Sequence, residues 1–430
     1  MSERSILIVG AGHAGVAAAH GLREHGWHEK IVLISDEGYL PYDRPALSKG
    51  VIAGLKTIEQ AEILSKGWIE KNKINFVKGL SVSQINIEAQ TATLSDGAKL
   101  DFHRLIFATG AYPRKLGVLG EQLCGVVYLR KAQDALVLKD RLVAGQEIVI
   151  IGGGLIGLEV AATAVTLGCK ITVVEKSSRL LARVAPAELA TAIQTIHEAR
   201  GVKFIFEGEV EHFEGETTVS GVKLLKHARL SCDLVLVAVG AAPAIELAEQ
   251  VGLRVDNGII VDQFLHSSNE SIYAVGDVAR YLTNEGKLVR LESWKNANDQ
   301  GECVAQNILG KKLPYQPMPW IWSDQFDVVM QVVGWLSDEW TCVRRDFEKN
   351  EFVLFMLDAD MHMRAAAAIG PVSMVGRAIK TCQAIIQKKI IVSADDLVNL
   401  HIDLKSLTHG NRVASPLPDV RAQTIATVAQ

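Results

Sequence analysis

The sequence contains one glycine pattern twice, and this repeat limits the possible folds more than any other feature. In its first copy, Gly10, Gly12 and Gly15 follow an apolar segment at 5–9 and precede a small-residue stretch typical of a helix at 16–24. The first glycine of such a turn allows a sharp bend, the second lets the backbone approach a pyrophosphate, and the third allows close packing of helix on strand. The pattern predicts a dinucleotide-binding unit.

An acidic residue follows where such a unit needs one. The next apolar segment, 31–34, leads to Asp36, which lies 21 residues after Gly15. A carboxylate at this distance can accept hydrogen bonds from a ribose hydroxyl. A glycine-rich turn alone occurs in many α/β proteins, but strand, turn, helix and acid in this order favour nucleotide binding.

The whole arrangement recurs 142 residues further along the chain. Gly152, Gly154 and Gly157 follow a second apolar strand, and the apolar strand after the helix ends at Glu175. This spacing is too long for a solenoid repeat and fits two dinucleotide-binding domains in one α/β chain. We therefore expect the protein to bind two nucleotides.

Composition excludes several other classes of protein. The 430 residues carry 45 Lys and Arg against 49 Asp and Glu without a basic block, which disfavours nucleic acid. Although 48% of the residues are apolar, the longest apolar runs fall short of the roughly 18 residues that span a membrane. Glycines interrupt the apolar N-terminal segment at once, so it indicates a strand and no signal peptide.

Cysteine and histidine spacing point to a protein without disulfides or bound metal. The six cysteines include no CxxC pair, and the twelve histidines show no metal-ligand spacing. Scattered, unpaired thiols are typical of a reducing compartment. We expect a cytoplasmic protein with no metal site and no membrane partner.

Three further apolar segments end in small residues. Residues 104–110 end in Ala-Thr-Gly, 234–243 contain the similar VAVGAAP, and 271–278 lead to Gly276 and Asp277, whose carboxylate could meet a ribityl hydroxyl. The proline-containing loop at 38–50 could lie over a large cofactor, the alternative being a solvated turn. The two glycine fingerprints are therefore accompanied by further segments that could contact a cofactor.

Together these segments resemble the FAD-dependent ferredoxin reductases of aromatic-ring dioxygenase and cytochrome P450 systems. The resemblance covers residues 5 to 405 or so and rests on GAGHAG, PYDRPALSKG, ATG, GGGLIGLE, VAVGAAP, YAVGD, ESWKNA and PWIWSDQFD. It implies a glutathione-reductase-like α/β fold with two Rossmann-like dinucleotide-binding domains and a C-terminal α/β interface domain. The implied boundaries are an FAD-binding domain at 1–112 and 236–314, an NAD-binding domain at 113–235, an interface domain at 315–414, and a flexible tail at 415–430.

The resemblance also implies cofactor-binding and reacting residues. The expected FAD contacts are Gly10, Gly12, Ala14, Gly15, Asp36, Arg44, Lys49, Val82, Ala108, Thr109, Gly110, Arg130, Gly276, Asp277, Glu292 and Trp294. The expected NAD contacts are Gly152, Gly154, Leu155, Ile156, Gly157, Glu175 and Gly240. Lys49 would reach the flavin with Glu159 as its ion-pair partner, and these two are the expected catalytic residues.

Glu175 favours NADH, because a carboxylate binds the two ribose hydroxyls and repels a 2′-phosphate. Lys176 and Arg179 follow it directly, which leaves weaker use of NADPH open.

The electron acceptor follows from the absence of a thiol relay. Disulfide-using relatives need a cysteine near the flavin loop, but the first cysteine, Cys124, comes well after it. The flavin must then pass electrons on singly, and the acceptor implied by the resemblance is a [2Fe–2S] ferredoxin of an oxygenase system. This chain lacks the four-cysteine spacing of such a cluster, so the cluster must belong to the partner.

Two regions of the C-terminal part are candidates for docking that partner. Trp320 and Trp322 would share one face of a strand, either as a half-buried aromatic pair or as part of the docking surface and electron path. Arg377, Lys380, Lys388 and Lys389 lie on or near a probable helix, either as a solvated face or as a contact for an acidic ferredoxin.

Three alternative functions stay open at this point. The chain could be a thiol-free NADH oxidase, a rubredoxin reductase, or a flavoprotein of the apoptosis-inducing-factor kind with slow turnover. Relative rates with a [2Fe–2S] partner and with oxygen would separate the first two from the leading hypothesis. We expect a monomer or a homodimer.

Overall fold

The computed structural model describes residues 4–283, 286–348 and 350–409. Contacts among these residues divide the chain into two compact units. The first contains the described residues up to 181 and those within 194–319, and the second contains those within 182–193 and from 320 onward. The tail expected at 415–430 lies outside the described residues. Among those residues, no helix has both the length and the apolar character needed to span a bilayer.

The first unit contains a parallel sheet built on the first glycine fingerprint. Its five strands, in spatial order, are β19 (Ile272–Ala274), β7 (Arg104–Phe107), β1 (Ser5–Val9), β2 (Lys30–Ser35) and β3 (Ile74–Lys78). All five residues of β1 are buried, as a parallel strand covered on both faces requires. The registers pair Val9 with Ile34 and Phe107, and Phe107 with Ala274, so the carboxyl ends of these strands share one edge.

A second parallel sheet in the same unit repeats this construction. Its strands, in spatial order, are β12 (Lys203–Ile205), β11 (Lys170–Val174), β10 (Glu147–Ile151), β16 (Leu234–Val237) and β9 (Val126–Val127). Ile151 pairs with Val174 and with Val237, so the residues that follow these strands again lie at one edge. In open parallel sheets such edges are where ligands bind.

Smaller sheets complete the first unit. They are β4 (Val82–Asn86), β5 (Thr91–Leu94) and β6 (Lys99–Asp101); β13 (Val210–Glu214), β14 (Gly221–Leu224) and β15 (Leu230–Ser231); β18 (Ile259–Val261), β20 (Ala279–Leu282) and β21 (Leu288–Val289); and the pair β8 (Ala111–Pro113) and β17 (Ala241–Pro243). β8 and β17 directly follow the ATG and VAVG segments, so they link the two parts of the chain that carry the fingerprints.

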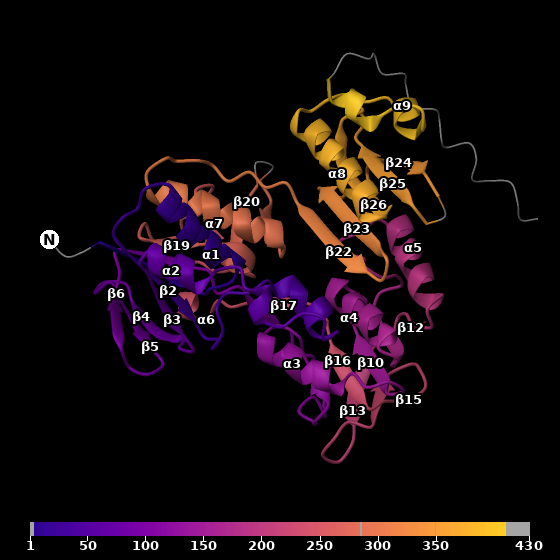
Figure 1. Cartoon of the computed structure of the whole chain (residues 1–430), viewed down its shortest axis with the longest axis horizontal. Coiled ribbons are helices and arrows are strands. Elements are labelled where there is room, and N and C mark those ends of the chain that lie inside the picture. The colour runs from indigo at the N-terminus through magenta and orange to yellow at the C-terminus, as the bar shows by residue number, and fades with distance from the viewer. Residues whose placement is uncertain (1–3, 284–285, 349, 410–430) are drawn as a thin grey trace, which may run out of the picture. The chain divides into compact units, whose positions relative to one another are not determined.

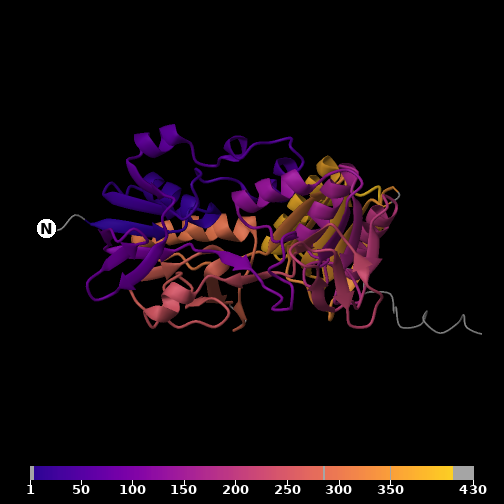
Figure 2. The same cartoon turned by 90° about the horizontal axis from the view of Figure 1, so that it is seen from below.

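Two helices pack closely beside the first sheet. α1 (His13–Glu24) and α7 (Trp294–Ile308) run side by side (Figures 1 and 2). A side chain at Gly301 would clash with the backbone of Ala14 and the methyl group of Ala17. The glycine therefore permits the close approach that places the beginning of α7 near the first fingerprint.

The remaining helices are shorter or belong to the second fingerprint. They are α2 (Lys66–Lys71), α3 (Ala132–Arg141), α4 (Leu155–Thr166), α5 (Ala187–Glu198) and α6 (Glu246–Gln250). α5 contains residues of both units. Most of α4 is buried, including Leu158, Val160 and Ala161, because it packs against the second sheet and the turn Leu47–Val51.

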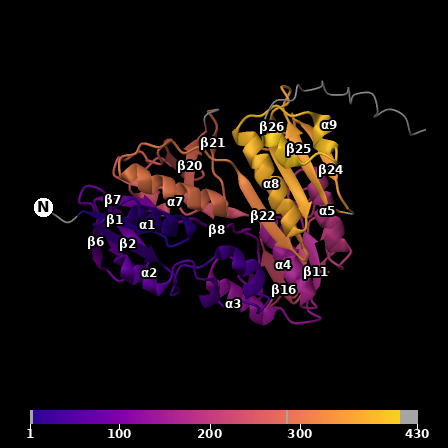
Figure 3. The ribbon, with the colours of Figure 1, turned by 45° about the horizontal axis from the view of Figure 1, so that its top comes forward.

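The second unit is an antiparallel sheet with helices. Its strands, in spatial order, are β22 (Trp320–Gln325), β23 (Val328–Gly334), β26 (Met363–Gly370), β25 (Phe352–Leu357) and β24 (Thr341–Asp346). The 16-residue α8 (Val372–Gln387) lies along this sheet (Figure 3). It is accompanied by α9 (Ala394–Val398) and the 3₁₀ turn η5 (Leu404–His409).

The structure corrects two details of the sequence analysis. The first helix begins at His13 instead of at residue 16, because Gly12 serves as its N-cap. The segment expected as an open loop at 38–50 contains a 3₁₀ turn, η1 (Arg44–Ala46), and a π-helical turn, η2 (Leu47–Val51). Pro45 fits the first turn of η1, since it lacks the N–H that such a turn leaves unpaired.

Candidate functional site

The first fingerprint has the geometry of a dinucleotide cradle. Gly10 has φ +110°, and a side chain there would clash with the carbonyl oxygen of Ala108, while one at Gly15 would clash with the carbonyl oxygen of Gly10. A side chain at Gly12 would meet only the Nε atom of Arg44, 3.9 Å away, among the described residues. The first and third glycines are thus required by packing, and the second leaves backbone open to a ligand, which fits FAD.

Arg44 lies beside this open backbone and is held in place by an ion pair. Its Nη2 is 2.9 Å from Oε1 of Glu37, and its Nη1 donates to the main-chain oxygen of Arg130 at 2.6 Å. Burial works to lower the pKa of Arg44, but Tyr42 and Glu37 outweigh it, so the net pKa is raised and the guanidinium stays charged. A fixed guanidinium beside Gly12 fits a pyrophosphate.

A second arginine, Arg130, is paired with the acid that follows β19. Nη2 of Arg130 is 2.9 Å from Oδ2 of Asp277, and both side chains are largely buried. Ala14 lies next to Gly276, where a side chain would be 2.9 Å from the Ala14 methyl group. The structure therefore brings together predicted FAD contacts from three separate stretches of sequence.

Buried polar atoms near Gly276 also fit a polar cofactor. Oε1 of Gln300 accepts from the amide of Gly276 at 2.7 Å, and Nε2 of Gln300 has no hydrogen-bond partner among the described residues. Gln300 is fully buried. An unpaired donor at full burial is costly, so this atom is suited to an acceptor that the chain itself does not supply.

The expected reacting pair is formed at the junction of the two fingerprints. Nζ of Lys49, in the π-helical turn η2, is 3.3 Å from Oε1 of Glu159 on α4. The other carboxylate oxygen of Glu159 accepts a hydrogen bond from the hydroxyl of Ser48. Glu159 is only 7% exposed and Ser48 only 5%. A buried carboxylate of the second fingerprint helix therefore orients Lys49, which comes from the loop after the first fingerprint.

The second fingerprint has the same geometry as the first. Side chains at Gly152 and Gly157 would clash with the carbonyl oxygens of Ala238 and Gly152, whereas no atom of the described residues lies within 4 Å of a side chain added at Gly154. The carboxylate of Glu175 accepts from the amides of Gly153 and Ser177, both at 2.7 Å. This fixes the acid at the edge of the nucleotide cradle.

The cations that follow Glu175 have partners of their own. Lys176 Nζ is 2.9 Å from Oε1 of Glu209, and Nη1 of Arg179 donates to the main-chain oxygen of Leu180. The carboxylate at the ribose end of the cradle, Glu175, favours a nucleotide without a 2′-phosphate.

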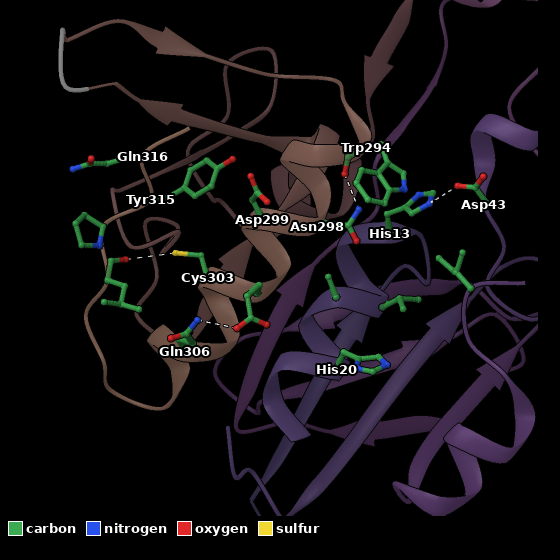
Figure 4. A pocket seen from close by; sticks show the side chains of 16 residues that line it. His13, His20, Asp43, Trp294, Asn298, Asp299, Cys303, Gln306, Tyr315 and Gln316 are labelled. Carbon is green, nitrogen blue, oxygen red and sulfur yellow. Dashed lines mark hydrogen bonds and ion pairs between the residues drawn. The ribbon is translucent and has the colours of Figure 1, made fainter. Parts of the chain in front are cut away.

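A cavity of about 920 Å³ opens beside the beginning of α7, within the first unit. Trp294 is 41% exposed there and meets the ring of His13 edge-on at 6.0 Å, and His13 pairs with Asp43 at 3.1 Å (Figure 4). Tyr315 and Cys303 line the far end. The predicted flavin contact Trp294 thus lies in the wall of this cavity.

Other predicted residues occupy less distinctive positions. Asp36 is paired with Lys131 at 2.6 Å and is half-exposed. The side chain of Val82 is buried in the core, so only its backbone could contact a cofactor. Thr109 donates to the main-chain oxygen of Ala244 at 3.0 Å, and Glu292 pairs with Arg290 at 2.6 Å.

The expected NAD contacts at the end of the second sheet lie where the fingerprint places them. Leu155 begins α4, and Ile156 is 42% exposed in its first turn, on the side of the nucleotide cradle. Gly240 follows β16 and has φ +102°. The exposed side chain of Ile156 offers an apolar contact three residues before Glu159, which suits the planar nicotinamide ring.

Trp320 and Trp322 share one face of β22 in the second unit, as their alternation predicts. Their rings stack with centroids 5.1 Å apart, and Trp320 donates through Nε1 to Gln331 at 3.2 Å.

Sequence reasoning missed the residues that hold the predicted ones. Glu37, Tyr42 and Ser48 each lie beside a predicted residue or within the same loop. The Tyr42 hydroxyl donates to Glu37 at 2.6 Å and accepts from the amide of Ala132 at 2.9 Å. Adjacency to Asp36 and Lys49 was the one available signal, since the contacts depend on side-chain directions or, for Tyr42 with Ala132 and Ser48 with Glu159, join residues far apart in sequence.

Comparison with known proteins gives concordant matches. Residues 4–301 match the pyridine nucleotide-disulphide oxidoreductase family, and residues 320–408 match the reductase C-terminal family. The anthranilate 1,2-dioxygenase system ferredoxin–NAD(+) reductase component of Burkholderia cepacia is 35% identical over 410 residues, which cover 94% of this chain and 100% of that protein. The rubredoxin-NAD(+) reductase of Pseudomonas putida is 37% identical over 337 residues, covering 78% and 87%.

A solved structure agrees with these relatives. The crystal structure of the covalent putidaredoxin reductase–putidaredoxin complex matches with a TM-score of 0.88 at 33% identity, covering 94% of this chain and 98% of that one.

Proposed function

The chain belongs to the pyridine nucleotide-disulphide oxidoreductase family, and from this premise we propose that it is an NADH-dependent ferredoxin reductase of an oxygenase system. When bound, FAD would supply the chemistry of accepting a hydride from NADH and giving up its two electrons one at a time. Each NADH would then reduce two [2Fe–2S] ferredoxins and leave NAD⁺ and a proton. The reaction would take place in the cytoplasm, which the six free cysteines support.

The observation that best supports this proposal is the Lys49–Glu159 pair, which joins the flavin loop to the helix of the second fingerprint. Disulfide-using relatives need a cysteine near this loop. The flanking sequence is PALSKG, and the first cysteine comes at position 124. An ammonium group here can bind the flavin and stabilise negative charge on it. No thiol is available at this position to carry electrons as a pair.

The cofactor residues act as holders and guides in this proposal. Arg44 and Arg130 would hold the pyrophosphate of FAD, and Asp277 its ribityl chain. Glu175, fixed by two amide donors, would bind the ribose of NADH. Glu159 would orient Lys49 and restrain the approach of the nicotinamide.

The partner surface is proposed on the second unit. Residues 371–393 contain four cations and no carboxylate, and Arg377, Lys380, Lys388 and Lys389 are all exposed on or just after α8. Such a face suits an acidic partner, because complementary charge speeds association. The stacked Trp320 and Trp322 are the proposed electron path to that partner.

A rubredoxin is the second candidate acceptor, favoured by the 37% identical rubredoxin-NAD(+) reductase. The deciding experiment measures the rate at which the purified, FAD-loaded protein and NADH reduce a [2Fe–2S] ferredoxin, a rubredoxin and oxygen. We expect the ferredoxin to be reduced fastest. Faster rubredoxin reduction would assign the second function, faster oxygen consumption would indicate an NADH oxidase, and slow turnover with all three would indicate a signalling flavoprotein.

Charge reversal tests the docking face in the same assay. Lys380→Glu should raise the ferredoxin KM and weaken its dependence on salt. Lys66→Glu is the matched control, because Lys66 is 82% exposed on α2 in the first unit and should leave the ferredoxin KM unchanged. Equal effects of the two variants would count against α8.

A further inference from the structure

The Glu159 carboxylate is held by two neighbours that are adjacent in sequence but differ in chemistry. One of its oxygens, Oε1, is 3.3 Å from the ammonium of Lys49. The other, Oε2, accepts from the hydroxyl of Ser48. Each oxygen therefore has its own donor, and the plane of the carboxylate is fixed by the pair.

Ser48 is itself attached to the same helix. Oγ1 of Thr163 lies 3.3 Å from the main-chain oxygen of Ser48 and 3.0 Å from that of Glu159, so these two acceptors share its one hydroxyl proton. Ser48 and Glu159 are both buried. The hydroxyl is thus presented to the carboxylate by the backbone and is not a surface group that happens to lie nearby.

The two donors divide the oxygens of one carboxylate between them. If the Ser48 hydroxyl is removed, Oε2 loses this donor inside a buried site, where losing a hydrogen bond to a charged group is costly. The ammonium of Lys49 can then turn to contact both oxygens, because it has three donors and a flexible stem. A lysine drawn toward the carboxylate is drawn away from the flavin side.

We propose that Ser48 is a positioning residue, whose hydroxyl fixes the Glu159 carboxylate so that Lys49 stays directed at the flavin. The proposal rests on the proposed reaction of FAD with NADH. It assigns to Ser48 a role in hydride transfer and none in binding the electron acceptor.

The test uses Ser48→Ala in the FAD-loaded enzyme, with Thr166→Val as a matched control. Thr166→Val removes a hydroxyl from the same helix, one that is exposed and bonds to the main-chain oxygen of Ala162 at 2.8 Å. We expect Ser48→Ala to slow anaerobic flavin reduction by NADH at least tenfold, the effect of a lost hydrogen bond to a charged group. Thr166→Val should leave the rate near that of the parent.

Glu159→Gln supplies a second, independent reading. Because Ser48 acts through Glu159, adding Ser48→Ala to Glu159→Gln should cause little further loss, whereas two separate structural effects would add. The same cycle is measured as the dissociation constant of NAD⁺ from the oxidised enzyme, which requires no turnover.

Three outcomes would overturn the proposal: Ser48→Ala reducing flavin as fast as the parent, Thr166→Val slowing it equally, or additive effects of Ser48→Ala and Glu159→Gln. If Ser48→Ala does not fold, additivity is tested with Ser48→Cys, which keeps a weak donor and should reduce its flavin more slowly than the parent. Failure of the proposed function is distinct, because the parent would then reduce its flavin with NADH but transfer no electrons to ferredoxin.

Discussion

Replacing Lys49 by alanine should impair the reaction with NADH far more than the reaction with ferredoxin. Opposite charges 3.3 Å apart attract by about 5 kcal/mol at an effective dielectric constant of about 20, and the desolvation of the pair offsets part of this. Breaking a buried pair costs roughly 3–5 kcal/mol. The lower end applies here, because Lys49 is 21% exposed and Glu159 keeps its bond from Ser48.

The kinetic effect is larger on one half-reaction because only hydride transfer needs the nicotinamide aligned with the flavin. A misplacement of about 1 Å can cost about 100-fold in rate, so we expect flavin reduction by NADH to slow by about that factor. Anaerobic stopped-flow absorbance separates this step from the oxidation of reduced enzyme by ferredoxin, which should change little. Lys66→Ala, an exposed lysine with a loose partner at 3.8 Å, is the control. Unchanged flavin reduction with impaired ferredoxin reduction would refute the assignment and move Lys49 to the docking side.

Three other variants or treatments test separate parts of the site. Asp277→Ala should weaken FAD binding by roughly 1.5–3 kcal/mol, the contribution of a hydrogen bond to a charged group, and flavin retained after dialysis as firmly as in the parent would show the assignment to be wrong. The parent should prefer NADH in kcat/KM, and Glu209→Gln should raise relative use of NADPH by up to about fivefold, because it frees Lys176 from an exposed ion pair; a parent that prefers NADPH would contradict this reasoning. Burial raises the pKa of Cys232 to about 12 and that of Cys303 to about 11, so both stay protonated at pH 8 and iodoacetamide should modify the exposed Cys124 first. Flavin reduction by NADH should survive this labelling, and its loss would indicate a thiol in the reaction.

Most of the fold could be predicted from local sequence. Strands β1 and β10 end at the expected residues, Val9 and Ile151, each directly before a glycine. They could be predicted because a buried parallel strand followed by a tight turn leaves a strong local pattern. The family and structure matches confirm the predicted fold class and the resemblance to ferredoxin reductases. The predicted domain boundaries remain predictions.

The turn that carries Lys49 shows where sequence reasoning failed. Its prolines and glycines predict a loop, but the segment forms a π-helical turn because Ser48 and Lys49 both contact α4, more than a hundred residues away. Tertiary contacts of this kind override local propensity.

The sequence predicts residues of the candidate site but not the contacts between them. Glycine spacing and strand-end acids indicate Gly12, Asp277 and Glu175, whose binding roles stay predictions. The Glu37–Arg44 and Ser48–Glu159 contacts could not be predicted, since each depends on side-chain directions within a folded loop. Spacing along the chain carries no information about which neighbour orients a given charge.

In the function that we propose, electrons enter as a pair from NADH and leave singly to a [2Fe–2S] ferredoxin. An anaerobic titration of the FAD-loaded protein with NADH, in the presence of excess oxidised ferredoxin, measures this directly from the ferredoxin absorbance. We predict two ferredoxins reduced for each NADH consumed, with no reduction when the protein is omitted. Consumption of one equivalent of NADH by the flavin, with the ferredoxin left oxidised, would contradict it.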